Sequence, residues 1–104
     1  MTTPYIVPIR AYTDNYIWVI RDHCHAAVVD PGDASPVLDY LRHEKLQLIA
    51  ILNTHHHKDH SGGNAALLQE FTVPVYGPEK ESIPTLTHRL REYTEKEKEE
   101  GNVY

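Results

Sequence analysis

The chain has 104 residues, with 10 Lys or Arg against 15 Asp or Glu, so its formal net charge is −5 at neutral pH. This length fits one domain, and the acidic balance argues against nonspecific nucleic-acid binding, which needs basic residues to replace phosphate counterions. The longest uninterrupted apolar runs, Tyr16–Ile20 and Leu48–Leu52, are much shorter than a membrane span. The single cysteine, Cys24, excludes an intrachain disulfide, and residues 1–10 lack a signal-peptide pattern, so we expect a cytoplasmic protein.

Three short strands are predicted in the N-terminal part of the chain. Tyr5–Ile9 is β-rich, and Pro8 within it favours an edge position in a sheet. Tyr16–Ile20 and Ala26–Val29 are strongly β-prone, and the polar residues 21–25 between them are typical of a hairpin loop. In the second of these strands Trp18 alternates in phase with residues 16 and 20, which assigns it to packing, and Tyr16 is expected in the core rather than at the border of a pocket.

A helix is predicted after the breaker at residues 30–33, where proline and glycine punctuate regular structure. Ser35 is the expected N-cap and Pro36 the first helical residue. Apolar residues then recur at helical spacing, at Val37, Leu38, Leu41 and Leu46. This pattern predicts a helix that packs one apolar side against a sheet, with His43 at its surface.

The rest of the chain alternates strands with helices. Leu48–Leu52 is continuous and apolar, as a strand buried on both faces would be. A second helix is predicted over Gly62–Glu70 and another strand over Val73–Tyr76. The resulting order, β-β-β-α-β-α-β, favours an α/β layered sheet with functional groups on the loops that follow strand ends. We divide the chain into a domain at residues 1–88 and a charged C-terminal tail at residues 89–104.

Four of the eight histidines lie just after the apolar run that ends at Leu52. Side chains two apart in extended backbone point the same way, so His55 and His57 are predicted to approach one metal ion together. Asp59 and His60 lie at the expected bend before the second helix, where they can face a second ion. Imidazole and carboxylate ligands suit zinc and also iron or manganese. Two such ions would activate water and polarise a carbonyl, which gives hydrolysis without a Ser or Cys nucleophile. The alternative is a histidine-rich surface loop.

The run Thr54–His60 resembles the T-H-x-H-x-D-H signature of the metallo-β-lactamase superfamily. Its flanks, at residues 11–16, 29–33, 61–64 and 75–78, further resemble glyoxalase II, the hydroxyacylglutathione hydrolase family. The resemblance implies the N-terminal half of an αββα sandwich. It also implies an enzyme that uses two divalent metal ions, zinc before iron or manganese, to cleave a small-molecule glutathione thioester. The implied products of S-D-lactoylglutathione are glutathione and D-lactate.

The resemblance also implies a role for each motif residue. By their positions in the motif, His55 and His57 are implied to bind the first metal ion, and Asp59 and His60 the second. Asp30 is implied to be structural rather than a ligand. Members of the family take further ligands from a second half, so this chain alone is expected to bind metal weakly. Half of a sandwich would expose an apolar sheet face and favour self-association. Two alternatives remain, namely a noncatalytic metal-binding or interaction fragment, and another hydrolase of the superfamily, such as a lactamase or nuclease.

Overall fold

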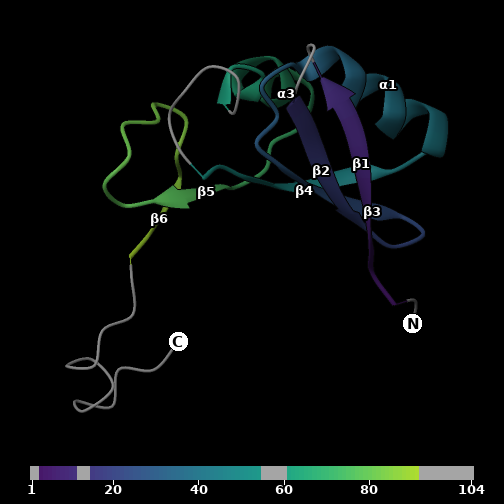
Figure 1. The fold of residues 1–104 in the computed structure, drawn as a ribbon, viewed down its shortest axis with the longest axis horizontal. Helices are drawn as coiled ribbons and strands as arrows, with labels where there is room; N and C mark the ends of the chain where they lie inside the picture. Colours follow the sequence, from purple (N-terminus) through teal and green to yellow (C-terminus); the bar gives the residue numbers. More distant parts are fainter. Residues whose placement is uncertain (1–2, 12–14, 55–60, 92–104) are drawn as a thin grey trace.

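The computed structural model describes residues 3–11, 15–54 and 61–91, which form a sheet with two helices (Figure 1). The elements in chain order are β1 (Tyr5–Ala11), β2 (Asn15–Arg21), β3 (His25–Val29), α1 (Ala34–Glu44), β4 (Gln47–Leu52), α3 (Asn64–Glu70), β5 (Val75–Pro78) and β6 (His88–Leu90). The predicted order of strands and helices is confirmed up to β5. Strand β6 is an addition, and it runs across the predicted division between residues 88 and 89.

The six strands lie side by side in chain order. The first three pair antiparallel, whereas β3, β4, β5 and β6 pair parallel. Strand β1 lies at the edge of the sheet, as Pro8 predicted, with this proline opposite Trp18. Because β3, β4 and β5 are parallel, their carboxyl ends open on one edge of the sheet. Within the described residues, neither helix is long and apolar enough to cross a membrane.

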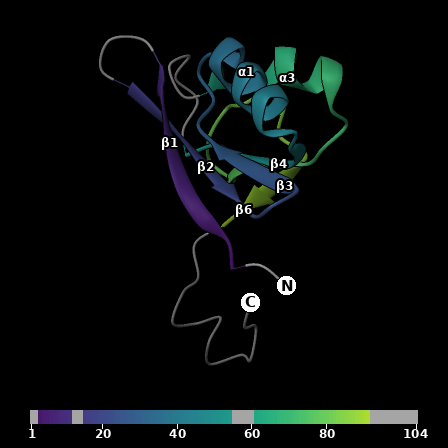
Figure 2. The ribbon, with the colours of Figure 1, turned by 90° about the vertical axis from the view of Figure 1, so that its right-hand side faces the viewer.

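Both helices cover the same face of the sheet, as the turned view shows (Figure 2). Alternate side chains of the strands point toward them, because successive residues of a strand face opposite sides. Side chains that are fully buried between the two layers are Ile17, Val19, Val28, Val37, Leu41, Leu48, Ile51, Leu67 and Val75. This core fixes the helices to the sheet, and with them the loops at the carboxyl ends of the parallel strands.

Helix α1 begins two residues earlier in the chain than predicted, because Asp33 is its N-cap and Ala34 its first residue. The prediction of Ser35 as the cap is therefore wrong. The carboxylate of Asp33 accepts a hydrogen bond from the backbone N–H of Ser35 at 3.0 Å. Aspartate and serine are comparable N-cap residues. Asp33 has the extended backbone of an N-cap, with φ −132°, so its side chain caps the helix in place of Ser35.

The face of the sheet opposite the helices carries large exposed apolar side chains. Tyr16, Trp18 and Ile20 alternate in phase along β2 as predicted, but they are 48%, 45% and 37% exposed, so the assignment of Trp18 to packing and of Tyr16 to the core is wrong for this chain. Ile6, the cross-strand partner of Ile20, is also exposed. Ile49 is 47% exposed, so β4 is buried on one face only. The physical reason is that both described helices lie on the other face.

Arg21 was predicted in a loop, but it ends β2 and is buried. Its guanidinium donates hydrogen bonds to the hydroxyl of Tyr40 at 2.9 Å and to the carboxylate of Glu44 on α1, and it lies over the ring of Tyr5. The hydrogen bond from Arg21 lowers the pKa of the Glu44 carboxyl, with a smaller contribution from His43. The hydrogen bond to Tyr40, followed by that to Glu44, raises the pKa of Arg21.

We expect this ion pair to make the chain more sensitive to acid than a Glu44→Gln variant. A carboxyl whose pKa is lowered on folding stabilises the fold fully above its ordinary value of 4.5, and that contribution is lost as the pH falls through the lower folded value. Urea midpoints should therefore fall more steeply for the wild type than for Glu44→Gln below that value. Glu70→Gln, in the exposed pair with Arg42, is the control and should follow the wild type. Parallel curves for the wild type and Glu44→Gln would contradict the expectation.

Candidate metal centre

The candidate site begins where the parallel strands β3 and β4 end. Val29 pairs with Leu52 at this edge, and the residue after each of them makes a further backbone hydrogen bond to the neighbouring strand. The N–H of Asp30 donates to the carbonyl of Leu52 at 2.7 Å, and the N–H of Asn53 donates to the carbonyl of Tyr76 in β5 at 2.8 Å. Ligands of open α/β sheets bind outside the carboxyl ends of parallel strands, so this edge is the natural place for a site.

Asp30 holds the residue that leads into the histidine segment, residues 55–60. One carboxylate oxygen of Asp30 accepts from the N–H of Thr54 at 2.7 Å, and the other accepts from the Thr54 hydroxyl at 2.6 Å. Asp30 is 8% exposed and has a φ of 53°, a left-handed conformation that aspartate tolerates better than most residues. Both carboxylate oxygens therefore hold Thr54, which supports the predicted structural role of Asp30.

Gly63 ties the far side of the histidine segment to the same turn. Its N–H donates to the carbonyl of Pro31 at 2.8 Å. A Cβ at this position would lie 2.5 Å from that carbonyl oxygen and 2.7 Å from the backbone nitrogen of Ala34, so only glycine allows the approach. The turn at residues 30–33 thus contacts the chain both before and after residues 55–60.

A buried pair of amides lies just outside these two anchors. The Nδ2 group of Asn64 donates to Oδ1 of Asn53 at 2.6 Å and to the hydroxyl of Thr85 at 2.8 Å. Asn53 returns a longer contact to Oδ1 of Asn64 at 3.5 Å. None of these three residues was predicted to have a role in the site. Two signals were available: an asparagine stands at each boundary of the segment, after β4 and at the first residue of α3, and Asn64 belongs to the flank at residues 61–64 that carries the family resemblance.

The predicted ligands His55, His57, Asp59 and His60 lie outside the described residues, so their arrangement stays a prediction. Among residues 3–11, 15–54 and 61–91 no three His, Cys, Asp or Glu side chains gather into a possible metal site. The donor set of the histidine segment, three imidazoles and one carboxylate, fits zinc, iron or manganese. The chemistry of these residues therefore fits a divalent metal.

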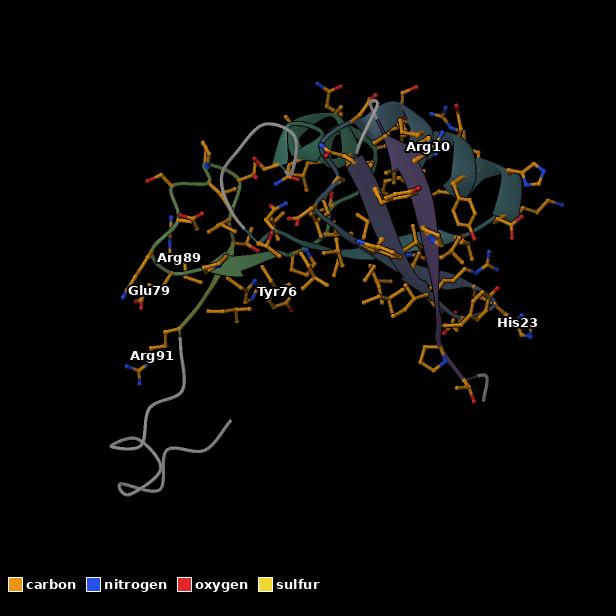
Figure 3. The ribbon with its side chains drawn as sticks, viewed as in Figure 1. Arg10, His23, Tyr76, Glu79, Arg89 and Arg91 are labelled. Carbon is orange, nitrogen blue, oxygen red and sulfur yellow. The ribbon has the colours of Figure 1, made fainter. Side chains whose placement is uncertain are left out.

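The turn between β2 and β3 is separate from this edge. Figure 3 shows His23 of this turn far from Tyr76 of β5. The carboxylate of Asp22 accepts from the N–H groups of Cys24 and His25 at 2.8 and 2.7 Å, and these two bonds lower the pKa of Asp22. Cys24 is exposed, so the prediction that it belongs to a polar turn is confirmed.

A hollow of about 290 Å³ opens beside Thr54. Tyr76 is one of its lining residues, and the ring of Tyr76 stacks on the imidazole of His88, with 4.7 Å between ring centroids. The surface of the hollow is mostly apolar, and its lining residues are Leu52, Asn53, Thr54, Tyr76, Gly77, Pro78, Leu90 and Arg91. Thr54, which precedes the histidine segment, therefore adjoins a space that can take a small organic group.

Sequence and fold place the chain in a known class. The sequence model of the Metallo-beta-lactamase superfamily matches residues 13–102, and the chain belongs to this superfamily. The crystal structure of BLEG-1 B3 metallo-beta-lactamase superposes with a TM-score of 0.62 and 35% identity, covering 69% of this chain and 36% of that one. That of ETHE1 from Myxococcus xanthus gives 0.67 and 22%, covering 84% and 40%, which supports the fold alone. The predicted α/β fold class is confirmed.

Among members of this superfamily, the chain is similar to curated relatives that are named hydroxyacylglutathione hydrolase. The hydroxyacylglutathione hydrolase of Nitrosomonas europaea is 56% identical over 87 residues, which are 84% of this chain and 33% of the relative. The protein of the same name from Alkalilimnicola ehrlichii is 57% identical over 89 residues, or 84% and 35% of the two chains. The resemblance seen in the sequence is therefore confirmed, and the chain spans about a third of the length of the curated relatives it matches.

Proposed function

We propose that the chain forms the metal-binding part of a thioester hydrolase that cleaves S-D-lactoylglutathione to glutathione and D-lactate. The structural observation that carries the proposal is the double anchoring of the histidine segment. Thr54 before it and Gly63 after it are both bonded to the turn at residues 30–33. The identity to relatives named hydroxyacylglutathione hydrolase supports the thioester substrate.

The metal ligands in this proposal are His55 and His57 for one ion and Asp59 and His60 for the other. Zinc is the preferred ion, with iron or manganese as alternatives of similar ligand preference. When bound, two such ions polarise the thioester carbonyl and lower the pKa of water. The residues of the frame act by position, since Asp30 and Gly63 fix where the ligand segment starts and ends.

A chimera tests this function. Residues 1–90 of this chain replace the matching part of the Nitrosomonas europaea relative, which supplies the length that this chain does not span. The zinc-loaded chimera should hydrolyse S-D-lactoylglutathione at a rate near that of the parent, and His57→Ala should abolish the activity. The isolated chain, with two protein ligands for each ion, should bind metal weakly. A folded, metal-loaded chimera without hydrolysis would refute the proposal.

A β-lactamase is the second candidate, because BLEG-1 shares 35% identity with this chain. The thioesterase is preferred, since the hydroxyacylglutathione hydrolases share 56% identity over a larger part of the chain. The two functions separate in one assay, in which the chimera is offered a chromogenic β-lactam and the glutathione thioester at equal concentration. Faster β-lactam hydrolysis would favour the second candidate.

We further propose that the isolated chain self-associates through the apolar sheet face. Trp18 and Tyr16 lie on this face with 6.0 Å between their ring centroids, and both are about half exposed. Large exposed apolar patches favour association. Sedimentation velocity should show concentration-dependent association that Trp18→Lys reduces. Gln69→Lys, which adds the same charge on exposed α3 surface, should leave it unchanged. Equal behaviour of the two variants would contradict this expectation.

A further inference from the structure

Asn64 connects three segments of the chain around the candidate site. It is the first residue of α3, and its partners are Asn53 at the end of β4 and Thr85 in the loop between β5 and β6. An asparagine amide has two N–H donors, and Asn64 uses one for each partner. The side chain is 1% exposed, so water does not replace either bond.

The position of this contact matters for the histidine segment. Asn53 directly precedes Thr54, and Asn64 directly follows Gly63, so the amide pair joins the described residues on either side of the histidine segment. Thr85, the other partner of Asn64, attaches the loop between β5 and β6 to the start of α3. Beside Thr85, Leu86 packs onto Gly77 of β5, where a Cβ would lie 2.6 Å from its Cδ2 atom.

We propose that Asn64 is a positioning residue for the metal centre and that its two donated hydrogen bonds set the metal affinity. This inference rests on the proposed function, because it takes residues 55–60 as the ligand segment. The amide holds the end of β4, the start of α3 and the β5–β6 loop at one separation, so the segment starts and ends in place. A fully bonded buried polar network specifies one arrangement. Residues that orient ligands from outside the coordination sphere typically change metal affinity by about 10- to 100-fold.

Two isosteric substitutions on opposite sides of the same contact test the proposal. Asn64→Asp removes both donors, so that carboxylate oxygens face Oδ1 of Asn53 and the hydroxyl of Thr85. Asn53→Asp introduces the same charge but keeps an oxygen that accepts from Asn64. Titration with Co²⁺, followed by its visible absorption, should show an affinity lower by about tenfold or more for Asn64→Asp and a smaller change for Asn53→Asp. Equal losses in the two variants would overturn the proposal.

The third segment has its own pair of variants. Thr85→Ser keeps the hydroxyl that accepts from Asn64, whereas Thr85→Val removes it with little change of volume. Cobalt affinity should remain at the wild-type level in Thr85→Ser and fall several-fold in Thr85→Val. The same affinity in both variants would show that the bond to Thr85 does not position the ligands.

A core variant separates positioning from general loss of stability. Leu41→Ala opens a cavity under α1, away from the amide pair, and should lower thermal stability without changing cobalt affinity. Amide exchange gives a second readout that needs no metal. In the apo chain, Asn64→Asp should speed the exchange of the Thr54 and Gly63 amides more than Leu41→Ala does. A folded, metal-loaded chimera without hydrolysis would refute the proposed function, whereas equal exchange in the two variants of the apo chain would refute the positioning role of Asn64.

Discussion

Asp30→Ala is expected to destabilise the chain by about 3 kcal/mol, the larger part from hydrogen bonds to a charged group and the rest from an alanine at positive φ. The carboxylate of Asp30 accepts both the N–H and the hydroxyl of Thr54, at 2.7 and 2.6 Å. Alanine offers no acceptor, and at φ 53° it also meets the steric penalty of the left-handed region. Cobalt affinity should fall with stability, because Thr54 leads directly into the ligand segment.

Asp30→Asn is the matched control. Asparagine tolerates the left-handed conformation and keeps one oxygen for the N–H of Thr54, while its NH₂ group can donate to the Thr54 hydroxyl. Its cost should be about 1 kcal/mol, the usual scale of a changed hydrogen bond. Urea denaturation of both variants measures the difference. An alanine variant as stable as the asparagine variant would show that the bonds to Thr54 do not hold this turn.

Gly63→Ala has the second large expected effect, about 3 kcal/mol, at the upper end of what overpacking usually costs. The added Cβ would lie 2.5 Å from the carbonyl oxygen of Pro31 and 2.7 Å from the nitrogen of Ala34. Both are backbone atoms, one in the turn at residues 30–33 and the other at the start of α1, so neither can rotate away. Relief requires α3 and the turn to separate, which breaks the bond from the Gly63 N–H to Pro31.

Gly77→Ala provides the same change in a softer environment. There the new Cβ would meet Cδ2 of Leu86 at 2.6 Å, and the next atoms lie at 3.4 Å. A leucine methyl group can move by a change of rotamer, so a loss of about 1 kcal/mol is expected. Thermal denaturation compares the two variants. Equal losses would contradict the view that the approach of Gly63 to Pro31 is a rigid backbone contact.

The strands and helices were predictable where apolar periodicity is strong, and the errors have identifiable causes. The continuous run at Leu48–Leu52 looked buried on both faces, but sequence does not show that the helices cover one face only. Arg21 was predicted in a loop because it is charged, whereas Glu44 and Tyr40 partner it inside the fold. Strand β6 has only three residues, all exposed, and carries no alternation that could predict it.

The candidate site was likewise predictable from the sequence only in part. Residue types and spacing in the histidine segment predict a metal site, and the two hydrogen bonds of Asp30 to Thr54 support the structural role that the family resemblance implies for it. The contact between Asn64 and Thr85 was not predictable, because it joins residues 21 apart that belong to no shared repeat. Bonds of this kind depend on how α3 lies against the β5–β6 loop, and no local pattern encodes that.

The most direct test of the metal centre is an anomalous difference map, collected at the zinc edge, from crystals of the chain grown with zinc. Anomalous density should lie within bonding distance of the side chains of His55, His57, Asp59 and His60, beside the carboxyl ends of β3 and β4. An ordered histidine segment without anomalous density, or zinc bound only elsewhere on the chain, would contradict the assignment of these residues as metal ligands.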